Sequence, residues 1–186
     1  MFKRILVALD GSAASNAGLK TAIQLAIDQH ATLLGMHVVD DAAVTINFEG
    51  GYMPAGYVDS LYQGLRESGQ ATLAKAQAAA RDAGAEMKPL LVDTRGQTVA
   101  EAILAQARKQ KADVIVLGTH GRRGLSRMLM GSDAEAVIRE TRVPVLLVRS
   151  RERATRKAGA SGKRDATAAR AGRTAASRTP PSRVTS

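Results

Sequence analysis

Apolar and polar positions alternate in blocks along the first 150 residues of the chain. Short apolar runs, most of them rich in β-branched residues, predict buried strands at 5–9, 32–39, 90–92 with its flanks, 114–117 and 143–148. The stretch 17–30 has helical periodicity, because its apolar side chains fall on one face: Leu19, Ala22, Ile23, Ala26 and Ile27. Further helices are predicted at 58–83, 98–109 and 133–140. The predicted order is an alternation of strands and helices that begins and ends with a strand.

This alternation predicts an α/β fold in which a parallel sheet is covered by helices on both faces. Hydrophobic residues make up 45% of the chain and aromatic residues only 3%, so the core is expected to consist of Ala, Val, Leu and Ile. Sheets of this kind bind ligands beyond the carboxyl ends of their strands, where the strand order reverses. We therefore expect the site among the loops at 10–12, 40–56 and 119–131.

The formal charge of +10 is concentrated at the end of the chain. Residues 1–150 hold 17 Lys and Arg against 15 Asp and Glu, whereas residues 151–186 hold 10 against 2. The second segment is rich in Ala, Arg, Ser and Thr and lacks aromatic residues, which predicts a disordered basic tail behind one domain at 1–150. Such a tail could bind nucleic acid in a salt-dependent manner. Without aromatic side chains to stack on bases, a solubilising extension is the favoured interpretation.

Three features of the sequence bear on location and chemistry. The chain has no cysteine, which excludes disulfides, thiolate nucleophiles and cysteine metal sites. No segment approaches the roughly 20 apolar residues that cross a bilayer. The first apolar run ends at Asp10, too early for a signal peptide. We expect a cytoplasmic protein.

A glycine-rich segment follows the predicted strand 114–117. The strand ends at Gly118, the chain continues through Gly121 and Gly124, and Gly131 with Ser132 opens the next helix. Glycines let backbone amides approach an anion without a side chain in the way, and a helix start favours phosphate. The segment is neither a Walker A loop nor the dinucleotide fingerprint. It nevertheless predicts a site that favours phosphate.

The spacing Gly-x2-Gly-x9-Gly-Ser resembles that of the ATP-binding branch of the universal stress protein family. The resemblance covers residues 2–149 and is carried by the segments 5–12, 36–40, 113–121 and 143–148. It implies a single doubly wound, five-stranded parallel sheet of the adenine nucleotide alpha hydrolase-like kind, with strand order 3-2-1-4-5. It also implies a homodimer with a role in stress adaptation.

Carried onto this chain, the resemblance implies a site for ATP or another adenine nucleotide, with Mg²⁺. Asp10 would lie near the ribose and Val38 against the adenine, and Ala8 stands where some nucleotide-binding relatives have proline. Leu117, Gly118 and Gly121 would line the sugar and phosphate side. The phosphates would lie against Gly131, Ser132 and the amide of Asp133. The Asp133 carboxylate could repel phosphate or help to position Mg²⁺, and no metal site formed by protein groups alone is expected.

Several of these residues have simpler interpretations. His120, Arg122, Arg123 and Arg127 could contact terminal phosphates, but a loop arginine is more often only solvated. Asp10, at a strand end before Gly-Ser, could cap the turn or the helix that follows. His37 lies within the second predicted strand, where a packed structural histidine is expected.

No arrangement of nucleophile, base and oxyanion donor can be read from the sequence. A bound nucleotide that acts as a conformational signal in stress adaptation is therefore the more economical hypothesis. Three alternatives stay open: slow ATP hydrolysis or phosphotransfer in the same pocket, nucleic-acid association through the tail, and a family member that acts only through protein contacts. The apolar run 143–148 is predicted to be an edge strand, and pairing with a second copy would cover that edge.

Overall fold

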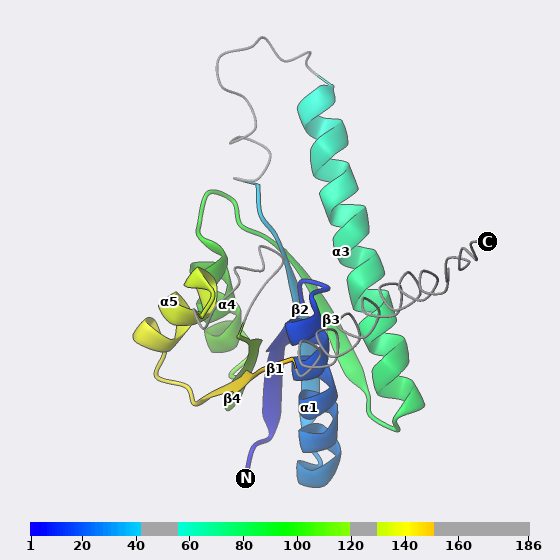
Figure 1. Cartoon of the computed structure of the whole chain (residues 1–186), viewed down its shortest axis with the longest axis vertical. Coiled ribbons are helices and arrows are strands. Elements are labelled where there is room, and N and C mark those ends of the chain that lie inside the picture. The colour runs from blue at the N-terminus through cyan, green and yellow to red at the C-terminus, as the bar shows by residue number, and fades with distance from the viewer. Residues whose placement is uncertain (42–55, 120–129, 151–186) are drawn as a thin grey trace, which may run out of the picture. The chain divides into compact units, whose positions relative to one another are not determined.

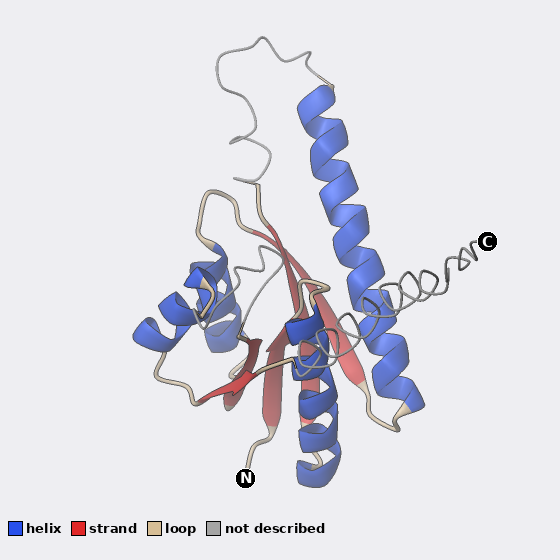
Figure 2. Cartoon of the chain, in the orientation of Figure 1, coloured by secondary structure: helices blue, strands red, loops and turns tan. Residues whose placement is uncertain are grey.

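The computed structural model describes residues 1–41, 56–119 and 130–150, all within one compact unit, Met1–Arg151. Five strands form one sheet, in which every strand pair is parallel. The strands are β1 Arg4–Ala8, β2 Thr32–Val39, β3 Met87–Asp93, β4 Val114–Gly118 and β5 Val145–Val148. Their order in the sheet is β3-β2-β1-β4-β5 (Figures 1 and 2). This confirms the predicted fold class and strand order.

Helices connect the strands, and two of them, α1 and α4, start at side-chain caps. They are α1 Ala13–Gln29, α3 Tyr57–Asp82, α4 Val99–Lys109 and α5 Ser132–Glu140. The helix α1 begins at Ala13 rather than at residue 17, because the Ser12 side chain accepts a hydrogen bond from the Ser15 amide. At α4, Thr98 and Glu101 form a reciprocal capping box. Polar caps thus determine where α1 and α4 begin, and at α1 they add a turn ahead of the apolar pattern.

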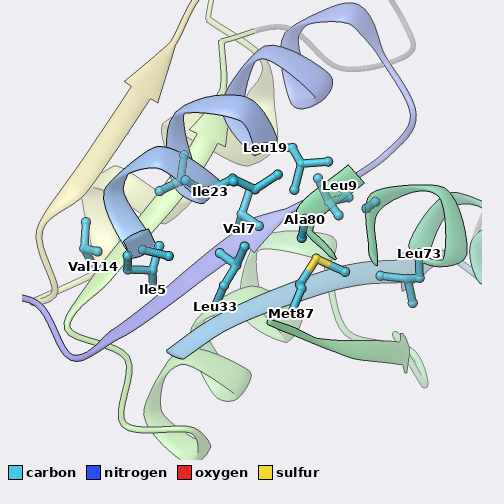
Figure 3. Close-up of a cluster of buried hydrophobic side chains, with 14 residues drawn as sticks. Ile5, Val7, Leu9, Leu19, Ile23, Leu33, Leu73, Ala80, Met87 and Val114 are labelled. Carbon is cyan, nitrogen blue, oxygen red and sulfur yellow. The ribbon is translucent and has the colours of Figure 1, made fainter. Parts of the chain in front are cut away.

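The two faces of the sheet bury separate clusters of apolar side chains. On one face, α1 packs against β1 and β4, and α3 packs against β2 and β3, and their apolar side chains form one cluster that includes Val7, Leu19 and Leu73 (Figure 3). On the other face, α4 and α5 pack against Leu6, Ile115 and neighbouring side chains. Since successive strand residues point to opposite faces, adjacent residues such as Leu6 and Val7 belong to different clusters. Burial on both faces explains why the central strands β1, β2 and β4 read as continuous apolar runs.

The last strand, β5, lies at one edge of the sheet, as predicted. It begins at Val145 rather than at 143, and Pro144, which has no amide proton to donate, contributes only its carbonyl, to the Ile115 amide. Leu146 and Leu147 are 36% and 37% exposed in the single chain. The edge therefore keeps an apolar surface.

Within the described ranges, no helix combines the length and apolarity needed to cross a membrane. The segments 42–55, 120–129 and 151–186 lie outside the described ranges. The predicted disorder of 151–186 therefore stays a prediction.

Candidate functional site

The order of the strands reverses between β1 and β4. From β1 the chain runs through α1 to β2 on one side, and from β3 it returns through α4 to β4 on the other side of β1. The connecting helices α1 and α4 cover opposite faces. The reversal point therefore lies at the carboxyl ends of β1 and β4, which is where doubly wound folds hold their ligands. Asp10 and Thr119 follow these two strand ends.

Asp10 lies in a tight turn between β1 and α1. Its Oδ1 accepts a hydrogen bond from the Ser12 amide at 2.9 Å, and Gly11 takes the left-handed conformation that the turn requires, with φ of 80°. Asp10 therefore does cap this turn, the simpler of its two predicted roles. The residue stays half-buried at the mouth of the site, so the turn fixes its position without sealing it in the core.

The absence of a side chain at Gly118 lets the end of β4 lie against the first turn of α1. A Cβ atom at this position would stand 2.7 Å from the Ala14 carbonyl carbon and 2.8 Å from the Ser15 amide nitrogen. These are backbone atoms, which cannot move aside without shifting the helix. The first glycine of the sequence motif thus has a packing role that the motif alone does not reveal.

The two ends of the glycine-rich segment are joined by a hydrogen bond. The Gly131 amide donates to the Thr119 carbonyl at 3.0 Å, and the Thr119 amide donates to the Val148 carbonyl at 2.9 Å. Thr119 itself is buried. The start of α5 therefore stands directly beside the end of β4, and Gly118 connects that point to the start of α1.

The start of α5 differs from the starts of α1 and α4. Gly131 occupies the N-cap with φ of −62°, an ordinary extended conformation, and it has no side chain with which to cap the helix. Ser132 and Asp133 are exposed in the first turn. Because the helix itself leaves its first amides without carbonyl partners, an uncapped start favours an anion. The acidic side chains Asp133 and Glu135 in this turn compete for the same positive end of the helix dipole.

The apolar residues predicted to line the base and sugar lie on one face of the sheet. Ala8 and Val38 are half-buried and pack against the cluster below α4 and α5, at the carboxyl ends of β1 and β2. Leu117 belongs to the same cluster but is only 4% exposed. Its side chain is part of the core, so only its backbone could reach a ligand.

Other predicted contacts fall in a segment that the structure does not describe. Gly121 and the candidate phosphate contacts His120, Arg122 and Arg123 lie within 120–129, as does Arg127. Their roles stay predictions. Among the described residues, no group of three or more His, Asp or Glu side chains is arranged to hold a metal ion.

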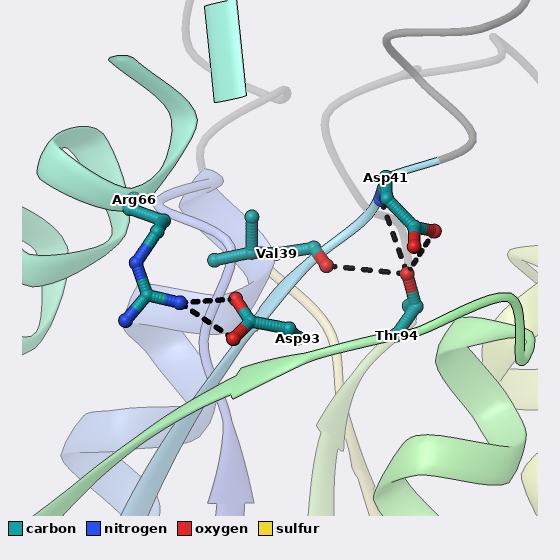
Figure 4. A network of polar contacts seen from close by, with 5 residues as sticks. All are labelled: Val39, Asp41, Arg66, Asp93 and Thr94. Atoms are coloured by element: carbon teal, nitrogen blue, oxygen red, sulfur yellow. Dashed lines mark hydrogen bonds and ion pairs between the residues drawn. The ribbon is translucent and has the colours of Figure 1, made fainter. Parts of the chain in front are cut away.

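The structure also shows a polar network that the sequence analysis did not single out (Figure 4). Asp41, which follows β2, exchanges hydrogen bonds with Thr94, which follows β3: the Asp41 amide donates to Thr94 Oγ1 at 3.1 Å, and Thr94 Oγ1 donates to Asp41 Oδ1. The Gly96 amide donates to Asp41 Oδ2 at 3.1 Å. This network fastens the end of β2 to the turn before α4.

The residue next to Thr94 forms an ion pair with the helix α3. The Asp93 carboxylate, at the end of β3, pairs with the Arg66 guanidinium on α3. That carboxylate is the main reason why the pKa of Arg66 is raised. Burial first, and then the same carboxylate, raise the pKa of the Tyr62 hydroxyl. Asp93 and Thr94, which are adjacent at the end of β3, thus bind α3 and the segment that follows β2. Two polar residues at the end of an apolar strand are the sequence signal that could have pointed to them.

Residues 1–149 match the model of the universal stress protein family. The universal stress protein YxiE of Bacillus subtilis is 33% identical over 151 residues, which cover 80% of this chain and 100% of YxiE. A solved structure of a universal stress protein family member from Burkholderia pseudomallei is 35% identical, with a TM-score of 0.62, over 78% of this chain and 95% of that one.

Two further solved structures hold nucleotides. A universal stress protein in complex with cAMP is 24% identical with a TM-score of 0.56, over 80% of this chain and 98% of that one. A universal stress protein from Archaeoglobus fulgidus in complex with dAMP is 23% identical with a TM-score of 0.53, over 78% and 97% of the two chains. At these identities the likeness is one of fold.

Proposed function

The chain belongs to the universal stress protein family, and we propose that it binds ATP, or another adenine nucleotide, at the carboxyl ends of β1 and β4. The bound nucleotide would serve as a conformational signal in stress adaptation. The observation that carries this proposal is the hydrogen bond from the Gly131 amide to the Thr119 carbonyl. It places an uncapped helix start, suited to phosphate, beside the end of β4, and β4 pairs with β1, the strand that leads to Asp10.

The described residues offer a suitable partner for each part of an adenine nucleotide. Ala8 and Val38 present half-buried apolar surface, against which a base can pack. The Asp10 carboxylate can accept hydrogen bonds from ribose hydroxyls. Ser132 and the first amides of α5 can donate to phosphate oxygens. Mg²⁺ would then be held chiefly by the phosphates, since the described residues form no cluster of metal ligands.

The nucleotide-bound relatives support the adenine part of the proposal. One binds cAMP and another dAMP, so both hold an adenine base and a phosphate. ATP is proposed for this chain because of the glycine spacing at Gly118, Gly121, Gly131 and Ser132. We propose binding rather than turnover, because no described side chain stands out as a nucleophile with its own base.

The test is calorimetric titration of nucleotide-free protein with Mg-ATP, AMP and cAMP. Gly131→Val is the sharpest variant, because the backbone conformation at 131 is open to any residue and the added bulk stands where phosphate would approach. We expect micromolar binding by the wild type and its loss in Gly131→Val. Binding that survives in Gly131→Val would place the nucleotide elsewhere.

A matched pair of aspartate variants tests the ribose end. Asp10→Asn keeps an oxygen that accepts from the Ser12 amide but loses the charge, whereas Asp28→Asn makes the same change on an exposed residue near the far end of α1. We expect weaker binding only in the first. Phosphate release, measured in the same samples, separates binding from slow hydrolysis. If the wild type binds none of the three nucleotides, the proposed function is wrong.

A further inference from the structure

The peptide group between Leu9 and Asp10 is held from both sides. The Leu9 carbonyl accepts a hydrogen bond from His37 Nδ1 at 2.7 Å, and the Asp10 amide donates to Ser15 Oγ at 3.4 Å. Because a peptide group is planar, two partners at its opposite ends fix its orientation. The turn that carries the Asp10 carboxylate starts from this peptide group, so its direction depends on His37 in β2 and on Ser15 in α1.

The geometry also defines the state of the His37 ring. A carbonyl oxygen can only accept, so Nδ1 must carry the proton. The ring is 5% exposed and lies on the side of β2 that faces α3. Apolar packing alone would not explain its place, because the ring nitrogen reaches across to the backbone of β1. His37 is thus the packed structural histidine that the sequence predicts, and its ring nitrogen also holds the Leu9 carbonyl.

The ring is held against β1 by α3. A Cβ atom at Gly69 would stand 2.6 Å from His37 Cδ2 and 3.1 Å from Nε2, and 2.8 Å from Leu91 Cδ1. The helix backbone therefore lies directly over the imidazole, and the absent side chain makes room for it. By contrast, Gly64 on the same helix has no atom within 4 Å of such a Cβ. Of these two glycines, only Gly69 is required by the histidine.

We propose that His37 is a positioning residue for the nucleotide site: it transmits the placement of α3 to the Leu9–Asp10 peptide and so aims the Asp10 carboxylate. This inference rests on the proposed function. It assigns His37 no contact with the ligand. Its predicted effect passes through the hydrogen bond from Nδ1, because that bond is the link between the imidazole and β1.

The experiment compares His37→Asn with His37→Leu in the full chain. The Asn side chain can place an amide N–H near the position of Nδ1, whereas Leu fills similar space without a donor. His30→Asn is the control, since His30 is exposed at the opposite end of α1. Two quantities are measured: the affinity for Mg-ATP by calorimetry, and hydrogen exchange of the Asp10 and Ser12 amides by NMR without nucleotide.

We expect His37→Leu to weaken binding and to speed exchange at Asp10 by about five- to tenfold, the effect of losing one net hydrogen bond. His37→Asn and His30→Asn should stay close to the wild type. If His37→Leu does not fold, Ser15→Ala removes the partner at the other end of the same peptide and should speed exchange at Asp10 in the same way. Gly69→Ala, but not Gly64→Ala, should resemble His37→Leu.

The exchange measurement keeps this inference separate from the proposed function. Wild-type binding with unchanged exchange and affinity in His37→Leu would overturn the inference and leave the nucleotide site intact. Equal losses in His37→Asn and His37→Leu would also overturn it, because ring packing would then account for the effect. If the wild type binds no nucleotide, the proposed function fails, while faster exchange in His37→Leu alone would still support the positioning of Asp10.

Discussion

Gly118 at the end of β4 lies so close to Ala14 in α1 that a Cβ atom at 118 would stand 2.7 Å from the Ala14 carbonyl carbon. We predict that Gly118→Ala destabilises the fold by about 1–3 kcal/mol, the usual range for forced overpacking. Urea unfolding followed by circular dichroism measures this difference. The same contact makes position 118 a poor place to test ligand binding, since a loss there would reflect the displaced helix.

Gly18 provides the matched control for that prediction. It lies in α1, and a Cβ atom there would meet its nearest neighbour, Val116 Cγ1, at an ordinary 3.7 Å. Because alanine is favoured over glycine inside a helix, Gly18→Ala should be neutral or stabilising by up to about 1 kcal/mol. Equal destabilisation by both substitutions would contradict the contact described here.

The fold could be read from the sequence because its pattern is simple. Strands buried on both faces give continuous apolar runs, and the helices between them show a clear apolar face, as at Leu19, Ala22 and Ile23. The boundaries of the helices and strands were harder to predict from the sequence. The start of α1 depends on a hydrogen bond of the Ser12 side chain, and the start of β5 falls after Pro144, so neither follows from periodicity.

The site could be predicted only in part, because the glycine motif identifies residues but not the residues that they contact. The glycine spacing drew attention to Gly118, but the helix that lies against it is distant in sequence and leaves no local signal. The same holds for Gly69. In the sequence it is only a helix-destabilising glycine, whereas in the structure the His37 ring occupies the space that a side chain at position 69 would need. Asp93 and Thr94 acquire partners, Arg66 and Asp41, that only the folded chain brings to them.

A pH-dependent contribution to stability is expected from Asp113, which precedes β4. The Asp113 Oδ2 atom accepts hydrogen bonds from the backbone amides of Lys3 and Arg4 at 2.7 and 2.8 Å, and these hydrogen bonds lower the pKa of the Asp113 carboxyl group. A carboxyl group with a lowered pKa in the folded state binds fewer protons there than in the unfolded chain. Its contribution is thus present above the unfolded pKa of about 4 and is lost as the pH falls through the folded value.

Asp113→Asn checks this assignment. Asn keeps an oxygen acceptor but has no charge to titrate, so the variant should lose less stability than the wild type between pH 5 and pH 2, roughly the range in which a paired aspartate titrates. Chemical unfolding at a series of pH values gives the comparison. Parallel pH profiles for the two proteins would show that Asp113 does not contribute.

The charge at the start of α5 leads to a prediction about the ligand. Asp133 is exposed in the first turn, beside the proposed phosphate position. We expect its carboxylate to repel phosphate, so Asp133→Asn should tighten binding of Mg-free ATP by about two- to fivefold, a modest effect because an exposed charge is screened by water. The change should be smaller for AMP, which carries fewer charges. Weaker binding confined to samples with Mg²⁺ would instead assign the carboxylate to the metal.

The exposed edge of the sheet leads to a prediction about assembly. We propose that β5 is covered by the same strand of a second copy, since Leu146, Leu147 and Ile138 leave an apolar surface there that a free monomer would expose to water. A shallow hollow of about 480 Å³, lined by Ile138, Pro144, Leu147 and their neighbours, adjoins this edge. A two-fold arrangement would place the same residues of both copies against each other.

Sedimentation velocity of the wild type and of Leu147→Lys tests this assembly. The substitution puts a charge on the exposed edge, where it would face its own copy across the two-fold axis, and it should shift the protein from dimer to monomer at micromolar concentration. Leu61→Lys is the control, because Leu61 is equally exposed at 36% but lies on α3, away from β5. A monomeric wild type, or a dimer that Leu147→Lys leaves intact, would show that β5 is not the interface.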